Sequence, residues 1–241
     1  MQVDRRLLLL GIPSTLVLNA CETVDPTILD QIAGLGGGLT EADAAKGIKA
    51  ALNNGVSHAI GKIGVLDGFW KDGIVQIPLP NTLQDVQSAL RLVGADGILN
   101  ELHQQLNRGA EKAVPVAKDI FVNAITSLTI RDAIDIVKGA DDAATTYLRQ
   151  STSSQLAQLF SPIMENALSQ TGALKLLDDV TQELSNIPFA PDLGADARRD
   201  LIGHGVDYGL KGLFHYVAEE EKAIRENPAK RTSEILRRVF G

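Results

Sequence analysis

Residues 196–226, DARRDLIGHGVDYGLKGLFHYVAEEEKAIRE, decide the fold of this chain. They contain no proline, and their apolar positions recur every three or four residues, which is the spacing of a helix with one buried face. The buried face is expected to carry Ile202, Val206, Leu210, Leu213 and Val217. Because one long helix cannot cover its own apolar face, we expect further helices to pack on it.

Three glycines, Gly205, Gly209 and Gly212, lie beside this apolar face at helical spacing. A glycine inside a helix costs about 1 kcal/mol relative to alanine. The cost is offset if the missing side chain lets a neighbouring helix come close. We therefore predict a tight helix–helix contact along this stretch.

The composition of the whole chain fits a bundle of helices. Hydrophobic residues make up 44% of the 241 positions and aromatic residues only 4%, so the core must be built mainly from Leu, Ile, Val and Ala. No segment alternates apolar and polar residues as a half-buried strand does. We predict an all-α fold, a single compact multi-helix domain over residues 40–241. The net charge of −7 argues against a nucleic-acid partner and against adsorption to anionic lipid through a basic face.

Caps and prolines set the limits of the other helices. The first begins at Thr40, whose hydroxyl has the spacing of a capping box with the carboxylate of Asp43. Pro115 falls inside a predicted helix over 96–128, where we expect a kink. Further helices are predicted over 81–93, 130–138, 141–150, 153–169 with Pro162 interrupting it, 172–185, and from Asn227-Pro228 to 240.

Two proline-containing linkers separate these helices and are predicted to be extended. Ile77-Pro78-Leu79-Pro80 ends the first, residues 64–80, and Ile187-Pro188-Phe189-Ala190-Pro191 forms the second. Proline cannot donate a backbone hydrogen bond, so neither linker can be regular helix. Their apolar side chains indicate that both pack down on the helices. An exposed aromatic rim around a groove is the alternative.

Residues 1–20 have the pattern of a cleaved signal peptide, with a positive start and then an uncharged run of fourteen residues that ends at Ala20. This run is too short to span a bilayer as a helix, which takes about 20 residues. Leu18-Asn19-Ala20-Cys21 resembles a lipobox, so we predict cleavage before Cys21 and lipidation of that cysteine. Cleavage by the ordinary signal peptidase is the alternative, and the paired arginines leave both the general and the twin-arginine export routes open.

The predicted destination is the periplasm, with the chain anchored to the outer membrane through lipid on Cys21. Residues 21–39 are predicted to be a flexible tether because they include the glycine-rich run 34–38. That run is not a phosphate-binding loop, since it lacks both the Lys-Ser/Thr ending and a preceding strand. Cys21 is the single cysteine of the chain, so no intrachain disulfide can form.

No group of residues has the spacing of a catalytic or metal centre, and we predict no cofactor. The best candidate for a binding cluster is Asn107, Arg108 and Glu111 near Pro115, joined by the acids Asp141 and Asp142. Both parts also have a plainer explanation. Arg108 and Glu111 are spaced as a helix-surface ion pair, and the two aspartates as acids at the start of a helix.

Several motifs also occur together in one group of proteins. They are Asp67-Gly68-Phe69, Ile77-Pro78-Leu79-Pro80, Asn107-Arg108-Gly109-Ala110-Glu111-Lys112-Ala113, Asp141-Asp142-Ala143-Ala144-Thr145, Ile187-Pro188-Phe189, and Ala218-Glu219-Glu220-Glu221-Lys222 through Arg225-Glu226-Asn227-Pro228 to Val239-Phe240-Gly241. With them the chain resembles the bacterial exported proteins of the domain-of-unknown-function 4197 family, from about residue 35 to the end. The resemblance implies a helical, envelope-located domain and brings no activity, cofactor or catalytic residue.

We therefore expect a non-enzymatic envelope protein whose helical bundle binds a protein partner or a small apolar ligand. The alternative is a hydrolase-type enzyme acting on cell-envelope material. In that case Arg108, Glu111 and one of the two aspartates, Asp141 or Asp142, would meet across helices to act on one substrate.

Overall fold

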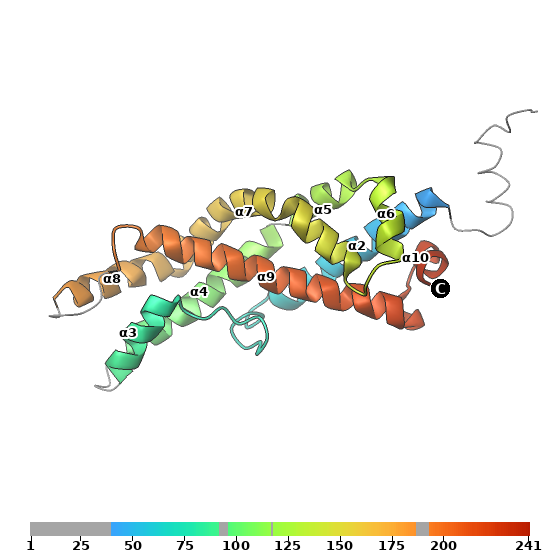
Figure 1. Ribbon diagram of the computed structural model, residues 1–241. Helices are drawn as coiled ribbons and strands as arrows, with labels where there is room; N and C mark the ends of the chain where they lie inside the picture. The colour runs from blue at the N-terminus through green and yellow to red at the C-terminus, as the bar shows by residue number, and fades with distance from the viewer. Residues whose placement is uncertain (1–39, 92–95, 117, 187–192) are drawn as a thin grey trace, which may run out of the picture. The chain divides into compact units, whose positions relative to one another are not determined.

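The computed structural model describes residues 40–91, 96–116, 118–186 and 193–241, which all belong to one compact unit, Leu39–Gly241. Within these ranges the chain forms nine α-helices, one 3₁₀ turn and no β-strand, which confirms the predicted all-α fold. The predictions for the signal peptide, Cys21, the tether and the linker 187–191 lie outside the described residues. The helices are α2 (Glu41–Ile63), α3 (Asn81–Arg91), α4 (Gly97–Val116), α5 (Lys118–Ser127), α6 (Ile130–Val137), α7 (Ala143–Thr171), α8 (Ala173–Ser185), α9 (Ala197–Glu226), η1 (Pro228–Lys230) and α10 (Glu234–Phe240) (Figure 1).

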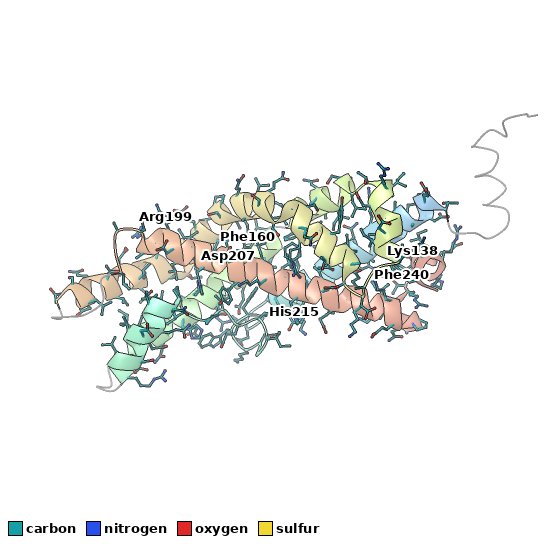
Figure 2. The ribbon with its side chains drawn as sticks, viewed as in Figure 1. Lys138, Phe160, Arg199, Asp207, His215 and Phe240 are labelled. Carbon is teal, nitrogen blue, oxygen red and sulfur yellow. The ribbon has the colours of Figure 1, made fainter. Side chains whose placement is uncertain are left out.

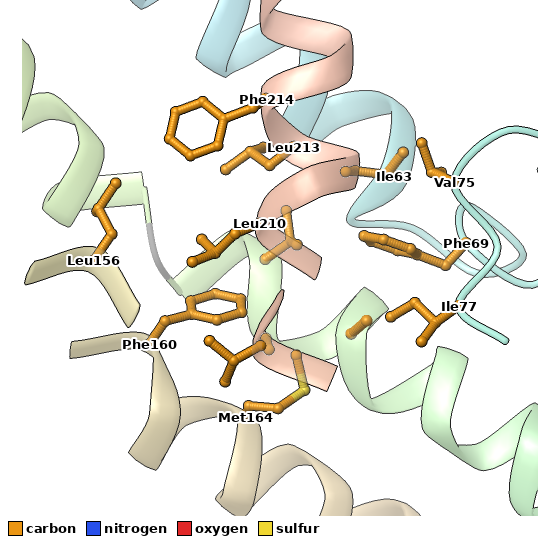
Figure 3. Packing of buried hydrophobic residues seen from close by; sticks show 14 of the residues in the cluster. Ile63, Phe69, Val75, Ile77, Leu156, Phe160, Met164, Leu210, Leu213 and Phe214 are labelled. Atoms are coloured by element: carbon orange, nitrogen blue, oxygen red, sulfur yellow. The ribbon is translucent and has the colours of Figure 1, made fainter. Parts of the chain in front are cut away.

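The long helix α9 organises the bundle. It packs mainly against α2 and α7 and also contacts α4 and α8 (Figure 1). Its apolar face is buried as predicted at every position except Ile202, which is half-buried. Figure 3 shows Leu210, Leu213 and Phe214 of this face in the core they share with Phe160 of α7. No helix in the described ranges is long and apolar enough to cross a membrane.

The glycines of α9 admit other parts of the chain to its surface. A Cβ atom added at Gly205 would lie 3.3 Å from the Met164 side chain, and one added at Gly209 would lie at the same distance from it. This close approach of α7 confirms the predicted helix–helix contact. Gly212 faces a different neighbour, because a Cβ atom there would lie 2.9 Å from the ring of Phe69 in the linker 64–80.

The helix break predicted at Pro162 is wrong. α7 runs unbroken through Pro162, although two helices, 141–150 and 153–169, are predicted there. The buried side chains of Phe160 and Met164 hold both flanks of this proline against α9, so tertiary packing outweighs the lost backbone hydrogen bond. Pro115 lies inside α4, which ends at Val116, and α5 begins at Lys118. The prediction of one kinked helix over 96–128 depends on residue 117, which lies outside the described residues.

The helix cap predicted at Thr40 is confirmed, whereas the predicted start of the last helix is wrong. Thr40 and Asp43 form the predicted capping box at the start of α2. Asn227 does act as a cap, but only for the 3₁₀ turn Pro228–Lys230. The final helix starts later than predicted, at Glu234, with the Ser233 hydroxyl as its cap.

Candidate functional site

The linker 64–80, from here on the loop 64–80, joins α2 to α3 through successive turns. As predicted, it packs down on the helices, since Phe69, Ile77 and Leu79 are buried. Three other side chains of the loop face solvent. Val65 is 50% exposed, Leu66 77% and Ile74 70%. The loop is therefore an amphipathic layer with one face in the core and apolar groups on its outer face.

Glu111 of α4 fixes the first half of the loop. Its Oε1 accepts hydrogen bonds from the backbone N–H groups of Phe69 and Trp70, both at 3.1 Å. Its Oε2 accepts one from Arg108 Nη1 at 2.8 Å, while Arg108 Nη2 donates to Asp67 Oδ1 at 2.6 Å. Glu111 is only 6% exposed, so these donors replace the water that the carboxylate has lost.

Asp67 occupies the one strained backbone position found among the described non-glycine residues, with φ of 70°. Aspartate tolerates this left-handed conformation better than most side chains. Hydrogen bonds from Lys71 and Arg108 hold its carboxylate and keep the pKa of Asp67 below its usual value. The turn that exposes Leu66 is thus held by the same arginine that pairs with Glu111.

Asn107 and two histidines fix the second half of the loop. Asn107 Oδ1 accepts a hydrogen bond from Ile77 N at 2.8 Å, and its Nδ2 donates to Ile77 O at 2.9 Å. His103 Nε2 lies 2.9 Å from the same carbonyl oxygen, and His204 Nε2 lies 2.7 Å from Pro78 O. Burial lowers the pKa of both histidines, so each neutral ring donates through Nε2. These bonds satisfy backbone groups that an extended, proline-containing segment cannot pair within itself.

A third anchor lies between these two, at Asp72. Its Oδ1 accepts a hydrogen bond from Ile74 N at 2.8 Å, and its Oδ2 accepts one from the hydroxyl of Tyr216 on α9. Burial and this hydrogen bond to a carboxylate raise the pKa of Tyr216. The Lys62 ammonium lies 4.0 Å from the centre of the Tyr216 ring. Asp72 therefore ties the outward-facing Ile74 turn to α9.

A second buried glutamate, Glu221 of α9, makes a similar clamp at the start of α7. Its two oxygens accept hydrogen bonds from the N–H groups of Ala144 at 3.0 Å and Thr145 at 2.8 Å. Arg225 pairs with Glu221 at 2.8 Å and also donates to the carbonyl of Ile136 at 3.0 Å. Glu221 thus caps α7 while Arg225 caps the end of α6, and α9 joins both helix ends.

The structure brings together only part of the predicted binding cluster. Asn107, Arg108 and Glu111 converge on the loop 64–80. Asp141 and Asp142 are exposed at the turn before α7, and no hydrogen bond or ion pair of the described chain joins them to the other three. Asp142 occupies the cap position of α7 without making the cap, which Glu221 supplies instead.

Glu221 and Arg225 are structural anchors whose role is not predicted from the sequence. A signal was present, because Glu221 lies four residues after Val217 and three before Ile224, in line with the apolar face of α9. A carboxylate at such a position must find buried donors. By contrast, no three His, Cys, Asp or Glu residues of the described segments are grouped to hold a metal ion.

These features define a class of protein, an all-helical domain in which buried Glu–Arg pairs fasten a loop and two helix ends. Comparison of the sequence with known families matches residues 38–241 to the family described as protein of unknown function (DUF4197). The chain belongs to this family, as its motifs predict. No curated protein and no solved structure was found to match the chain.

Proposed function

We propose that this protein is a non-enzymatic binding module of the bacterial envelope, and that it binds a protein partner through the loop 64–80. One observation carries the proposal. Apolar side chains stand exposed on a loop that buried hydrogen bonds fasten along its whole length.

The exposed apolar residues gather at this loop. The large hydrophobic side chains that are exposed in the described domain are Val65, Leu66, Ile74, Val116, Ile130 and Leu159. Three of these belong to the loop, and Val116 follows Pro115, whose ring would lie 2.8 Å from a Cβ atom at Gly64. Half of these exposed large apolar side chains therefore belong to one short loop, which favours this loop as the interaction surface.

The anchors also favour binding on energetic grounds. A loop that must become ordered on binding loses part of its interaction free energy to that ordering, whereas a preformed loop does not. Glu111, Asn107 and Asp72 hold the loop before any partner arrives. Because Val65 and Leu66 project outward and do not enclose a cavity, a protein surface suits them better than a small ligand does.

The chemistry of the anchors supports this proposal over the hydrolase alternative. Both oxygens of Glu111 are engaged by backbone and guanidinium donors, and both terminal nitrogens of Arg108 are engaged by carboxylates. A general acid or base needs a position from which it reaches substrate. These groups bind the protein's own loop.

We further propose that the module is exported and held at the outer membrane by lipid on Cys21, with residues 21–39 as the tether. Mass spectrometry of the mature N-terminus tests this anchor. A diacylated cysteine at the N-terminus supports it, and an unmodified Cys21 or cleavage elsewhere contradicts it.

Site-specific photo-crosslinking in cells tests the partner surface. A photoreactive amino acid at position 66 or 74 should give a discrete crosslinked product that contains one envelope protein. Position 159 is the matched control, because Leu159 is also an exposed apolar residue, 47% exposed, but lies on α7. No product at positions 66 and 74, or the same product at 159, would contradict the proposal.

A further inference from the structure

A groove of about 520 Å³ lies between α7 and α9, on the stretch of α9 that continues from Gly205 and Gly209 toward its C-terminus. The buried side chains of Leu210 and Phe214 form its floor. Its volume falls within the range of roughly 300–1,000 Å³ that small-molecule sites occupy. Along α9 it extends from Asp207 to Ala218, about 16 Å at 1.5 Å per residue. Asp207 and His215, which both line it, are marked in Figure 2.

Two cations stand on opposite walls of this groove, Arg149 on α7 and Lys211 on α9. Neither forms an ion pair with any residue the structure describes. The Arg149 guanidinium lies 5.4 Å from the centre of the Phe214 ring, and the Lys211 ammonium lies 4.4 Å from that of Tyr208. The Arg149 charge rests on a ring that lines the groove, whereas the Lys211 charge rests on Tyr208, which lines the adjoining hollow beside Ile74. Lys211 lines the groove as well, so both cations are available to a ligand there.

The two acidic residues that line the groove, Asp142 and Asp207, lie near its two ends. Met164 of α7 lies against Gly205 and Thr145 against Glu221, so the two helices are antiparallel. Asp142 precedes α7 and Asp207 lies near the opposite end of the groove, while Arg149 and Lys211 come between them. The middle of the groove is thus its positive part.

His215 supplies a third polar group there. It lines both this groove and a smaller hollow of about 220 Å³ beside Ile74. Its Nε2 is buried and has no hydrogen-bond partner in the described part of the protein. A buried ring nitrogen without a partner is unfavourable in a finished fold and points to a group that is supplied from outside.

We propose that the α7–α9 groove binds a small amphiphile with one anionic group, a carboxylate or a phosphate. Arg149 and Lys211 hold the anion from the two walls, His215 donates to it, and the apolar part of the ligand lies on Leu210 and Phe214. No residue that lines this groove belongs to the loop 64–80, so this proposal and the proposed partner surface can each fail without the other.

Isothermal titration of the full mature chain with four eight-carbon probes tests this site. Octanoate and octyl phosphate should each saturate one site, and the tighter of the two identifies the anionic group. Octanol and octyltrimethylammonium should bind at least about tenfold more weakly, since a charge-assisted hydrogen bond is lost.

Substitutions locate the binding. Arg149→Gln and Lys211→Gln should each weaken the anionic probes about tenfold, the effect of one charge-assisted contact. Arg131→Gln and Lys138→Gln are matched controls, because these side chains are exposed outside the groove, and they should leave affinity unchanged. Both groove cations are exposed as well, so their substitution should not unfold the chain.

A nuclear magnetic resonance measurement on the wild-type protein tests the site without any substitution. The ¹⁵N resonance of His215 Nε2 should shift as octanoate saturates the wild-type protein. Octanol binding as tightly as octanoate, groove variants that match the controls, or an unmoved His215 resonance would each overturn the proposal.

Discussion

Glu111 and Phe69 are 42 positions apart in the sequence, yet the carboxylate of one accepts the backbone N–H of the other at 3.1 Å. The same oxygen also holds the N–H of Trp70. An irregular segment has no helical ladder to pair its backbone groups, so a buried side chain must do so. This bond allows the loop to bury Phe69 while leaving Leu66 exposed beside it.

The clamp at Glu221 should contribute strongly to stability. Glu221→Gln leaves Arg225 without its buried counter-charge and weakens the cap of α7. We expect the free energy of unfolding, measured by urea denaturation, to fall by about 3 kcal/mol. Glu219→Gln is the matched control on the exposed face of α9 and should stay within about 0.5 kcal/mol of wild type. Equal effects of the two substitutions would refute the clamp.

The close contact at Gly212 predicts opposite signs for two glycine substitutions on one helix. Gly212→Ala places a Cβ 2.9 Å from the Phe69 ring and 3.1 Å from Val75, and should destabilise the protein by about 1–3 kcal/mol. Gly203→Ala meets nothing within 4 Å and should stabilise it by up to about 1 kcal/mol. Thermal unfolding followed by circular dichroism compares the two. A neutral Gly212→Ala would show that the loop does not need this space.

Because α7 is continuous through Pro162, replacing this proline should stabilise the protein. Pro162 is exposed and lies inside the helix, where it lacks the N–H that the preceding turn requires. Pro162→Ala should raise the unfolding free energy by about 1–3 kcal/mol in urea denaturation. A loss of stability would indicate that the proline shapes α7 for its contact with α9.

Stability should fall between neutral and mildly acidic pH because of His103 and His204. Burial lowers the pKa of both rings below their ordinary value, so the unfolded chain binds these protons at higher pH than the folded chain does. The stability that they contribute is complete above about pH 6.5 and is lost as the pH falls through the folded-state values. The urea midpoint should therefore be lower at pH 5.5 than at pH 7.5.

One substitution isolates the contribution of His204. His204→Gln can still donate to the Pro78 carbonyl but cannot be protonated, so it should reduce the change in midpoint between the two pH values. His103→Gln should reduce it in the same way, because the ring of His103 is half-buried against the Ile77 carbonyl. A midpoint that is equal at both pH values in the wild type would contradict this account.

Local patterns made most of the fold predictable. The Thr40–Asp43 capping box and the apolar face of residues 196–226 are written in neighbouring residues, and both were predicted correctly. Pro162 was not, because its local signal predicts a break while the packing of Phe160 and Met164 on α9 lies in a distant part of the chain. Tertiary contacts decide such cases, and one sequence does not display them.

Arg108 and Glu111 could be singled out from the sequence, but their role in holding the loop 64–80 could not. Arg108 and Glu111 have the three-residue spacing of a helix-surface ion pair, and that spacing is the same whether the pair is exposed or buried. Their partner, the backbone at Phe69, lies in another segment, so no local pattern reveals it. The exposed side chains Leu66 and Ile74 were equally hidden, since in sequence they look like further core residues.

Amide hydrogen exchange at Phe69 and Trp70 tests most directly whether Glu111 holds the loop. In the wild type and in Glu101→Ala, a control at an exposed glutamate of α4, both amides should exchange slowly. In Glu111→Ala they should exchange at least about tenfold faster, while Ala144 and Thr145, which bind Glu221, keep their wild-type rates. Unchanged protection of Phe69 and Trp70 in Glu111→Ala would contradict the account.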